Sequence, residues 1–399
     1  MLGFNLYDLG TLPGGTYATP TAVNRNGDVV GVADTVGNQG SQMVAHAFLW
    51  ERRTRKLIDL HDAYAQPVFA GEASRAGDIN DLGWIVGTAR VVGGEEHAFV
   101  CKKSQSGGYL PFEELLPPKY GGGRYSSSAN AINSAGWVVG SVSSNEGENV
   151  VNSDAVLWQN GLSIDLANSQ NRVSRAFDIN DHDQIVGSAV FVNQSTAEMP
   201  FFWSLFSGMV SLGTLGGAYG KAIAINNSGT IVGESLIDAN TVHGFAYQWS
   251  SPQDVLPRGV IWDLGPTFAN ESTTNDISDD GKMVGTVSLA GASQSFAELI
   301  QEGVYSNLNS LDQLDLGWQL LSSGAISSNG AYVAGTGLLG GEARAWLLET
   351  VHVQSGIHRD AIVPISFGSL VDGVRHRLGV VGHITPPVPE QPWGFFSAR

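Results

Sequence analysis

The chain repeats a short pattern in which a hydrophobic pair follows a polar turn and precedes a glycine. The pattern occurs seven times, as AVNRNGDVVG (22–31), DINDLGWIVG (78–87), AINSAGWVVG (131–140), DINDHDQIVG (178–187), AINNSGTIVG (224–233), DISDDGKMVG (276–285) and AISSNGAYVAG (325–335). The closing glycines stand at positions 31, 87, 140, 187, 233, 285 and 335, so successive copies are 46 to 56 residues apart. A period of this length is typical of the blades of a β-propeller.

Each copy predicts a β-hairpin. An Asn or Ser opens the turn, where its side chain can accept hydrogen bonds from backbone amides ahead of it. Three residues later comes a glycine, which suits the positive φ of a type I turn followed by a bulge, and in the fourth copy Asp183 takes this position. The residues concerned are Asn24, Asn80, Asn133, Asn180, Asn226, Ser278 and Ser327, with Gly27, Gly83, Gly136, Gly229, Gly281 and Gly330.

An aromatic segment and a further short hydrophobic segment follow the hairpins. The aromatic segments are HAFLW (46–50), HAFVC (97–101), DAVLW (154–158), PFFW (200–203), HGFAY (243–247), SFAEL (295–299) and RAWLL (344–348). The last segment is clearest as LIDL (57–60), SIDL (163–166), VSLG (210–213) and IWDLG (261–265). Each unit therefore predicts four strands, and we expect an all-β protein with a seven-bladed β-propeller over residues 1–350.

The two ends of the repeat region predict how the ring closes. NLYDLGTL (5–12) has the form of a fourth strand without a preceding blade, whereas no clear fourth strand follows RAWLL (344–348). Pairing the two would close the ring and remove an exposed sheet edge. Residues 351–399 are expected to form a β-rich C-terminal extension. Because they contain GVVG (379–382) and WGFFS (393–397), a degenerate eighth blade is the alternative.

Composition narrows the range of partners. The chain has 51 glycines, 15% charged residues and a formal net charge of −17, so it lacks the clustered Lys and Arg that grip phosphates, and nucleic acid is not an expected partner. No run of about 18 apolar residues predicts membrane insertion. The N-terminus lacks the basic and apolar regions of a signal peptide. The single cysteine, Cys101, cannot form an internal disulfide and is expected to be a small core residue.

Several of these motifs together carry a family resemblance. DLGTLPGG (8–15), SLGTLGG (211–217), the AIN hairpins and the HAFLW-like strands resemble the HAF-repeat family of bacterial extracellular proteins. The resemblance covers roughly residues 5–350, and seven copies with a regular period make it specific. It implies a propeller-like fold and a secreted or cell-surface location. It implies no reaction, because the family offers no catalytic residues that could be assigned to this sequence.

The residues that could carry chemistry do not form a recognisable site. His46, His97 and His243 stand at equivalent positions of separate units, so we interpret them as structural residues bonded to backbone or to a neighbouring Asp rather than as metal ligands. The acidic turns DINDHD (178–183) and DISDD (276–280) do not have the spacing of a calcium loop. No G-x-S-x-G nucleophile motif occurs. The sequence thus assigns no catalytic residue, metal or cofactor, and an enzyme would need residues that only folding brings together.

Two tryptophans depart from the repeat and are the candidate binding residues. Most other copies have a polar residue at the position of these tryptophans, which indicates that the position is exposed to solvent. Exposed aromatic rings can stack on sugars or anchor a protein. The structural alternative is packing beneath a neighbouring loop, for which the inserts 102–126 and 141–153 are available. Trp84 and Trp137 follow the turn glycine, where the other copies have Asp28, Gln184, Thr230, Lys282 and Ala331.

The leading functional hypothesis is a non-catalytic binding or structural module, secreted or surface-exposed, whose loops are presented to a polysaccharide or a protein. One alternative is a polysaccharide-active hydrolase or lyase with its site in the propeller funnel. Another is a subunit of a polymeric assembly in which residues 351–399 add a strand to a neighbouring copy.

Overall fold

The structure is a computed structural model. It describes residues 2–352 except for 38–42, 119–123, 147–148, 167–170, 193–196, 250–258, 267–268, 290–293, 312–313 and 315–316. Strand accounts for 61% and helix for 4%, which confirms the predicted all-β class. No helix within these described residues has the length and apolar character needed to cross a membrane.

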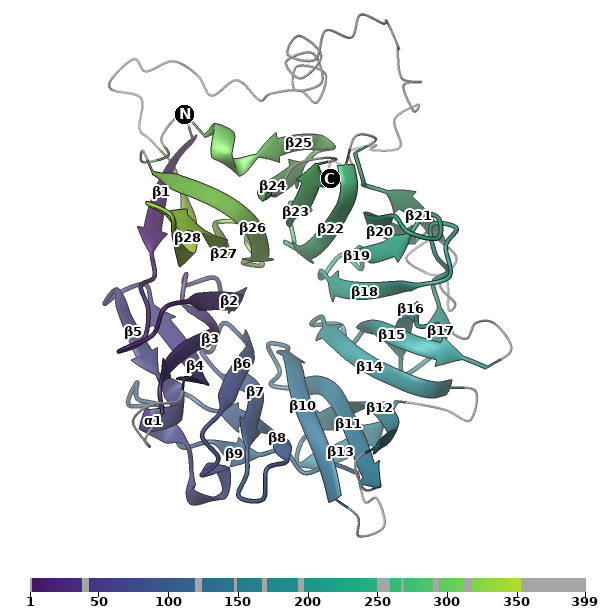
Figure 1. Cartoon of the computed structure of the whole chain (residues 1–399). Helices are drawn as coiled ribbons and strands as arrows, with labels where there is room; N and C mark the ends of the chain where they lie inside the picture. The colour runs from purple at the N-terminus through teal and green to yellow at the C-terminus, as the bar shows by residue number, and fades with distance from the viewer. Residues whose placement is uncertain are drawn as a thin grey trace, which may run out of the picture.

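Seven four-stranded antiparallel sheets stand around a common axis as the blades of a propeller (Figure 1). Blade 1 contains β2 (Ala18–Val23), β3 (Val29–Val36), β4 (Met43–Glu51) and β5 (Lys56–Asp59), and blade 2 contains β6 (Ser74–Ile79), β7 (Ile85–Arg90), β8 (Glu96–Cys101) and β9 (Glu113–Glu114). Blade 3 contains β10 (Arg124–Ile132), β11 (Val138–Glu146), β12 (Asn149–Gln159) and β13 (Leu162–Asp165), and blade 4 contains β14 (Asn171–Ile179), β15 (Ile185–Phe191), β16 (Met199–Ser204) and β17 (Gly208–Ser211).

The remaining blades follow the same order. Blade 5 contains β18 (Gly220–Ile225), β19 (Ile231–Leu236), β20 (Val242–Trp249) and β21 (Gly259–Asp263), and blade 6 contains β22 (Ala269–Ile277), β23 (Met283–Leu289), β24 (Ser295–Gln301) and β25 (Val304–Asn307). Blade 7 contains β26 (Trp318–Ile326), β27 (Tyr332–Leu339), β28 (Glu342–His352) and the N-terminal β1 (Leu2–Asp8). The described helices are short: α1 (Leu60–Tyr64), η1 (Pro67–Phe69) and η2 (Leu308–Ser310).

The predicted hairpins form the first two strands of each blade. Their turn glycines have φ between 66° and 82°, and Asp183, which replaces the glycine in blade 4, has φ 60°, so the predicted turn geometry is confirmed. The closing glycine is needed for close packing. At Gly31 an added Cβ would lie 2.1 Å from the carbonyl oxygen of Thr19 and 2.8 Å from the Phe48 ring, which covers this position from β4.

The first strand of each blade faces the axis and contacts the first strands of the two neighbouring blades. Near its end, each of these strands contains a β-bulge. A bulge changes the direction in which the following side chain points. Residues just after the bulges, such as Asp78 in β6, line the axial channel.

The ring closes as the sequence predicts. Strand β1 pairs antiparallel with β28 in a register that runs from Leu2 opposite His352 to Asp8 opposite Trp346. Figure 1 shows β1 at the outer side of blade 7, beside β28 from the other end of the described chain. Blades 7 and 1 are in contact through β26 and β2. The described residues therefore form a ring of seven blades. Of the predicted extension 351–399, residues 351 and 352 belong to β28, and residues 353–399 lie outside the described residues.

Candidate functional site

The turn asparagines of blades 1 to 5 each bond to the following blade. In its own turn, the side-chain oxygen of Asn80 accepts hydrogen bonds from the amides of Leu82 at 3.1 Å and Trp84 at 2.9 Å. Its side-chain nitrogen donates to the carbonyl oxygen of Asn133 in blade 3 at 3.1 Å. The same bond between blades joins Asn24 to Asn80, Asn133 to Asn180, Asn180 to Asn226 and Asn226 to Ser278. The sequence predicts the bonds within the turn. The series of five bonds between neighbouring blades, which we call the asparagine relay, is seen only in the folded ring.

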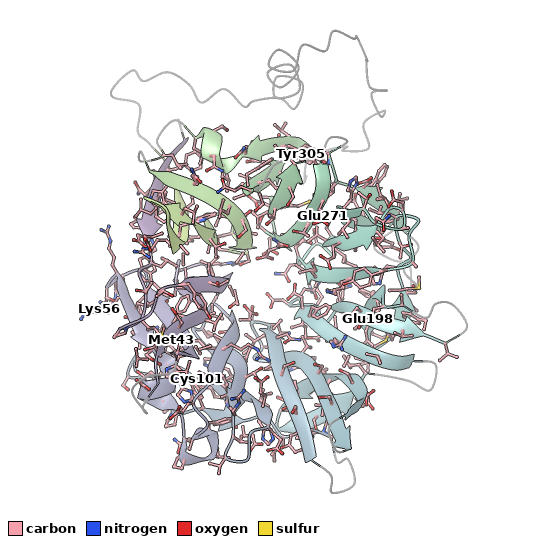
Figure 2. The ribbon with its side chains drawn as sticks, in the orientation of Figure 1. Met43, Lys56, Cys101, Glu198, Glu271 and Tyr305 are labelled. Atoms are coloured by element: carbon pink, nitrogen blue, oxygen red, sulfur yellow. The ribbon has the colours of Figure 1, made fainter. Side chains whose placement is uncertain are left out.

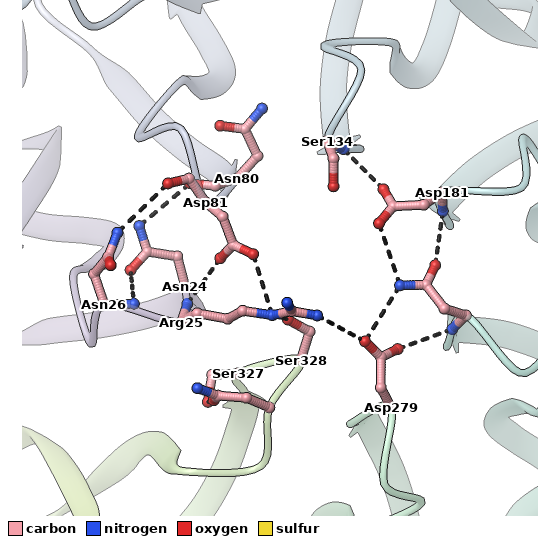
Figure 3. A network of polar contacts seen from close by, with 12 residues as sticks. Asn24, Arg25, Asn26, Asn80, Asp81, Ser134, Asp181, Asp279, Ser327 and Ser328 are labelled. Atoms are coloured by element: carbon pink, nitrogen blue, oxygen red, sulfur yellow. Dashed lines mark hydrogen bonds and ion pairs between the residues drawn. The ribbon is translucent and has the colours of Figure 1, made fainter.

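A second ring of polar residues surrounds the mouth of the axial channel at these turns. Four neighbouring pairs are joined by a backbone amide of one member that donates to a side-chain oxygen of the next. The Ser134 amide donates to Asp181 Oδ1 at 2.9 Å (Figure 3). The Asn227 amide donates to Asp279 Oδ1 at 3.0 Å. The members directly follow the turn Asn or Ser: Arg25, Asp81, Ser134, Asp181, Asn227, Asp279 and Ser328.

The Arg25 side chain crosses this mouth (Figure 3). Its Nε atom donates to Ser328 Oγ at 2.8 Å and lies 3.2 Å from Asp81 Oδ2. Its Nη2 atom lies 3.0 Å from Asp279 Oδ2. One guanidinium from blade 1 therefore contacts blades 2, 6 and 7. The side chain is 48% exposed, so these ion pairs contribute little net stability, but they hold the guanidinium across the opening.

Three aspartates project into the channel beyond this mouth. Asp78, Asp178 and Asp276 follow the bulges of β6, β14 and β22, in alternate blades, and line the same cavity of about 160 Å³. Each carboxylate accepts one hydrogen bond from the next residue of its own strand and one from a backbone amide of the following blade. For Asp178 the donors are Ile179 and Ile225, both at 2.7 Å, and the other two aspartates make the same pair of bonds.

Burial raises the pKa of all three carboxyl groups. The side chains keep some exposure to the cavity, but the surrounding protein limits their hydration. The pKa rises to about 6 for Asp78 and to about 7 for Asp178, and the pKa of Asp276 lies well above its usual range. For the last two, the charges of neighbouring axial carboxylates add to the effect of burial, whereas the backbone amides oppose it. The channel thus holds three carboxyl groups whose pKa values are raised above the usual range, a property that active sites often share.

The structure places Trp84 and Trp137 in two different blade junctions, and neither lines the channel cavity. Both are half-buried. The Trp84 ring packs on the turn glycine Gly136 of blade 3, where an added Cβ would lie 2.8 Å from ring atom Cζ3. The Lys102 ammonium group lies 5.5 Å from the centroid of the same ring. Trp137 packs against the core between blades 3 and 4. Part of each residue is exposed, and a role in binding stays a prediction.

The equivalent of Trp84 in blade 7 is Tyr332, not Ala331 as the sequence comparison predicts. The turn between β26 and β27 is one residue longer than the asparagine turns, because the Tyr332 amide donates to Ser327 Oγ five residues earlier, whereas the corresponding bond elsewhere spans four residues. Tyr332 packs on Gly27 of the next blade. Aligning the copies from their closing glycines, rather than from their turns, gives this equivalence directly from the sequence.

The three histidines of the aromatic strands do not converge, as their positions in separate units predict. Each is bonded through Nδ1 to a carboxylate oxygen that lies on the outermost strand of its own blade. The pairs are His46 with Asp59 at 2.8 Å, His97 with Glu114 at 2.6 Å and His243 with Asp263 at 2.9 Å. The pairs therefore link the third and fourth strands of blades 1, 2 and 5.

Cys101 lies in β8 of blade 2, where it is fully buried, as expected for a core residue (Figure 2). Burial raises the pKa of its thiol to about 12. Because the thiolate is the reactive form, burial disfavours a nucleophilic role for this cysteine.

Arg25 and the axial aspartates are site residues that the search for known motifs does not find. The sequence does carry a trace of them, since the second, fourth and sixth copies begin with Asp where the other four begin with Ala. Within a single hairpin, an Asp in place of Ala has no special meaning, because polar residues are common near turns. Only the closed ring brings Asp78, Asp178 and Asp276 to one cavity.

No family model and no curated protein matches this sequence. The fold does match solved structures. The oligogalacturonate lyase of Vibrio parahaemolyticus is 10% identical, with a TM-score of 0.55 over 88% of this chain and 97% of the lyase. The acylaminoacyl peptidase of Pyrococcus horikoshii is 12% identical, with a TM-score of 0.50, and the match covers 85% of this chain and 53% of the peptidase. At these identities the likeness shows the propeller fold alone.

Proposed function

We propose that this protein is a non-catalytic binding module, secreted or exposed at the cell surface, whose propeller presents its loops to a polysaccharide or a protein. The main support for the proposal is that the polar side chains of the axial channel are bonded to neighbouring blades. The axial carboxylates accept hydrogen bonds from backbone amides of two blades, and Arg25 spans one mouth. A channel whose polar groups join blades acts as the rigid centre of a scaffold. The secreted location rests on the family resemblance.

Charge favours a neutral or cationic partner. The net charge is −17, and Asp81, Asp181 and Asp279 surround the channel mouth with Arg25 as the cation among them. An anionic polymer such as an oligogalacturonate would be repelled by this arrangement. The fold shared with an oligogalacturonate lyase therefore does not extend, in this proposal, to the lyase's substrate.

Apolar side chains on the same face as this mouth favour a protein partner. The turn between β16 and β17 exposes Leu205 (82%) and Phe206 (87%), and Leu162 (67%) directly follows the corresponding turn of blade 3, at the start of β13. In an antiparallel meander, turns between third and fourth strands lie on the same face as turns between first and second strands. Exposed aromatic and aliphatic groups of this kind are suited to protein contacts.

The test compares binding with turnover. Full-length protein is screened against arrays of neutral and acidic polysaccharides and in pull-down assays for protein partners, and the bound polymers are then assayed for new reducing ends and unsaturated products. The proposal expects retention without turnover. Two variants locate the surface: Trp84→Gln with Trp137→Gln, and Leu205→Ser with Phe206→Ser. Because the tryptophans are half-buried, their double replacement should also cost about 2 kcal/mol per ring, less than the ~3–5 kcal/mol of a fully buried ring.

A polysaccharide hydrolase is the second candidate, and the raised pKa values of the axial aspartates favour it. Carboxylic acids that hold a proton near neutral pH can act as general acids. In this case the channel would admit substrate from the mouth that Arg25 does not span. Turnover that disappears in the Asp178→Asn variant, while the variant stays folded, would replace the binding proposal with this one.

A further inference from the structure

Blade 1 places a second carboxylate beside its histidine pair. His46 Nδ1 lies 2.8 Å from Asp59 Oδ2 and 3.9 Å from Asp62 Oδ1. The three ligand atoms all lie within 4.8 Å of one another, the one such group of His, Cys, Asp and Glu among the residues that the structure describes. We infer that His46, Asp59 and Asp62 form a binding site for a first-row divalent transition metal such as Zn²⁺.

The local fold orients the two aspartates toward the histidine. Asp59 ends β5 and caps α1, and its Oδ1 accepts a hydrogen bond from the Asp62 amide at 3.0 Å. Its other oxygen is thereby directed to His46. The short helix also brings the Asp62 carboxylate over the strand end that carries Asp59. One carboxylate therefore positions both other ligands.

The imidazole is fixed by a second histidine. The ring of His61 in α1 lies against that of His46, with centroids 4.4 Å apart. His61 Nδ1 is in turn 3.0 Å from the hydroxyl of Ser74 in β6, the first strand of blade 2. A neighbouring ring that is itself fixed by a hydrogen bond restricts the orientation of a ligating imidazole. The histidine ligand is thus held before any ion arrives.

The donor set fits a transition metal better than calcium. Zn²⁺ takes imidazole nitrogen and carboxylate oxygen at about 2.0–2.2 Å, which places ligand atoms roughly 3–4 Å apart, close to the spacing of this group. Calcium instead needs about six to eight oxygen ligands. His46 is buried and Asp59 nearly so, whereas the Asp62 side chain is 60% exposed. Three protein ligands and an open side toward solvent leave room for water or for an oxygen of a bound partner.

The other blades provide an internal comparison. In blade 2, His97 bonds Glu114, and the neighbour that shares this carboxylate is the hydroxyl of Tyr125 at 3.0 Å. In blade 5, His243 bonds Asp263. Neither pair has a second carboxylate within ligand distance among the described residues. The histidine pair by itself links two strands, and Asp62 is what blade 1 adds.

The test uses the full-length protein after removal of metal with EDTA. Zn²⁺ binding is measured by isothermal titration calorimetry and by the shift of Tm for the wild type, for Asp62→Asn and for the control Asp263→Asn. We expect the wild type to bind one equivalent of Zn²⁺ that Asp62→Asn loses or binds at least tenfold more weakly, and that Asp263→Asn retains. Co²⁺ provides a second readout, because its visible absorption changes when imidazole and carboxylate coordinate it.

Asp62 is exposed, so Asp62→Asn should melt like the wild type in the absence of metal, and Asp62→Ser serves if it does not. Zn²⁺ held by other histidines of the chain would survive the Asp62 change. Equal Zn²⁺ stoichiometry and affinity in wild type and both Asp62 variants would overturn the inference. So would a wild-type protein whose Tm and Co²⁺ spectrum do not respond to metal.

Discussion

Replacing Asn80 by Ser and by Ala should separate the two bonds that a turn asparagine makes. Ser keeps a short acceptor for the turn, as Ser278 Oγ does when it accepts from the Lys282 amide at 3.0 Å, but it lacks the nitrogen that donates to the next blade. Losing that one bond should cost about 1 kcal/mol. Ala also leaves the amides of Leu82 and Trp84 without their acceptor, so its total cost should be about 3 kcal/mol.

Urea unfolding followed by tryptophan fluorescence measures both variants against the wild type. The free energy of unfolding should fall in the order wild type, Asn80→Ser, Asn80→Ala, because Asn80 is only 6% exposed and water cannot replace the lost bonds. Ser278→Ala is the matched control, since Ser278 has no amide nitrogen to donate and should lose only the turn contribution. If Asn80→Ser is as stable as the wild type, the relay between blades contributes nothing to stability and the reasoning is refuted.

Further predictions concern ring closure and pH. Deleting residues 1–8 removes β1 and exposes the edge of β28, so Tm should fall by several degrees and concentration-dependent association should appear in light scattering; an unchanged Tm would mean that β1 does not close the ring. Glu349→Gln should also lower Tm, because it removes the buried negative charge that pairs with Arg52 and one of the two carboxylate oxygens that accept from Arg52 and Tyr7. Burial raises the pKa of Glu298 to about 8. An unfolded Glu releases its proton near pH 4.5 while the folded one retains it, so stability should fall as pH rises between these values. Glu298→Gln should become more stable than the wild type by roughly 3 kcal/mol between pH 5 and pH 8, and parallel stability curves would contradict this.

The hairpins and the closing strand could be predicted from the sequence because their chemistry is local. A turn needs its Asn and Gly at fixed spacing, and a missing fourth strand at one end pairs with a spare strand at the other. Contacts between blades join residues about 50 positions apart, and no local pattern encodes their partners. The bond from Asn80 to Asn133 is an example. The helix α1 could not be predicted either, because LHDAY follows a strand in one blade only and has no periodic signal.

The channel residues show a further limit of prediction from single repeats. Asp78 and Ala131 occupy equivalent positions, and each looks ordinary in its own hairpin. The folded ring shows that an Asp in one blade serves the following blade, since the Asp78 carboxylate accepts from the Ile132 amide at 2.9 Å. The structural unit along the axis is therefore a pair of blades. A search for motifs within one repeat cannot find it.

The alternation of Asp and Ala along the axis cannot be complete in a ring of seven blades. Because seven is odd, alternation of Asp and Ala must fail once, and it fails where Ala325 of blade 7 meets Ala22 of blade 1. The asparagine relay is also missing there among the described contacts, because the blade 7 turn has Ser327 in place of Asn. Besides the bond from Arg25 to Ser328 at the channel mouth, this junction is held farther from the axis: Glu349 pairs with Arg52 of blade 1 and accepts from Tyr7 of β1 at 2.7 Å. Closure thus depends on contacts that β1 itself brings, which is why losing eight residues should destabilise the whole ring.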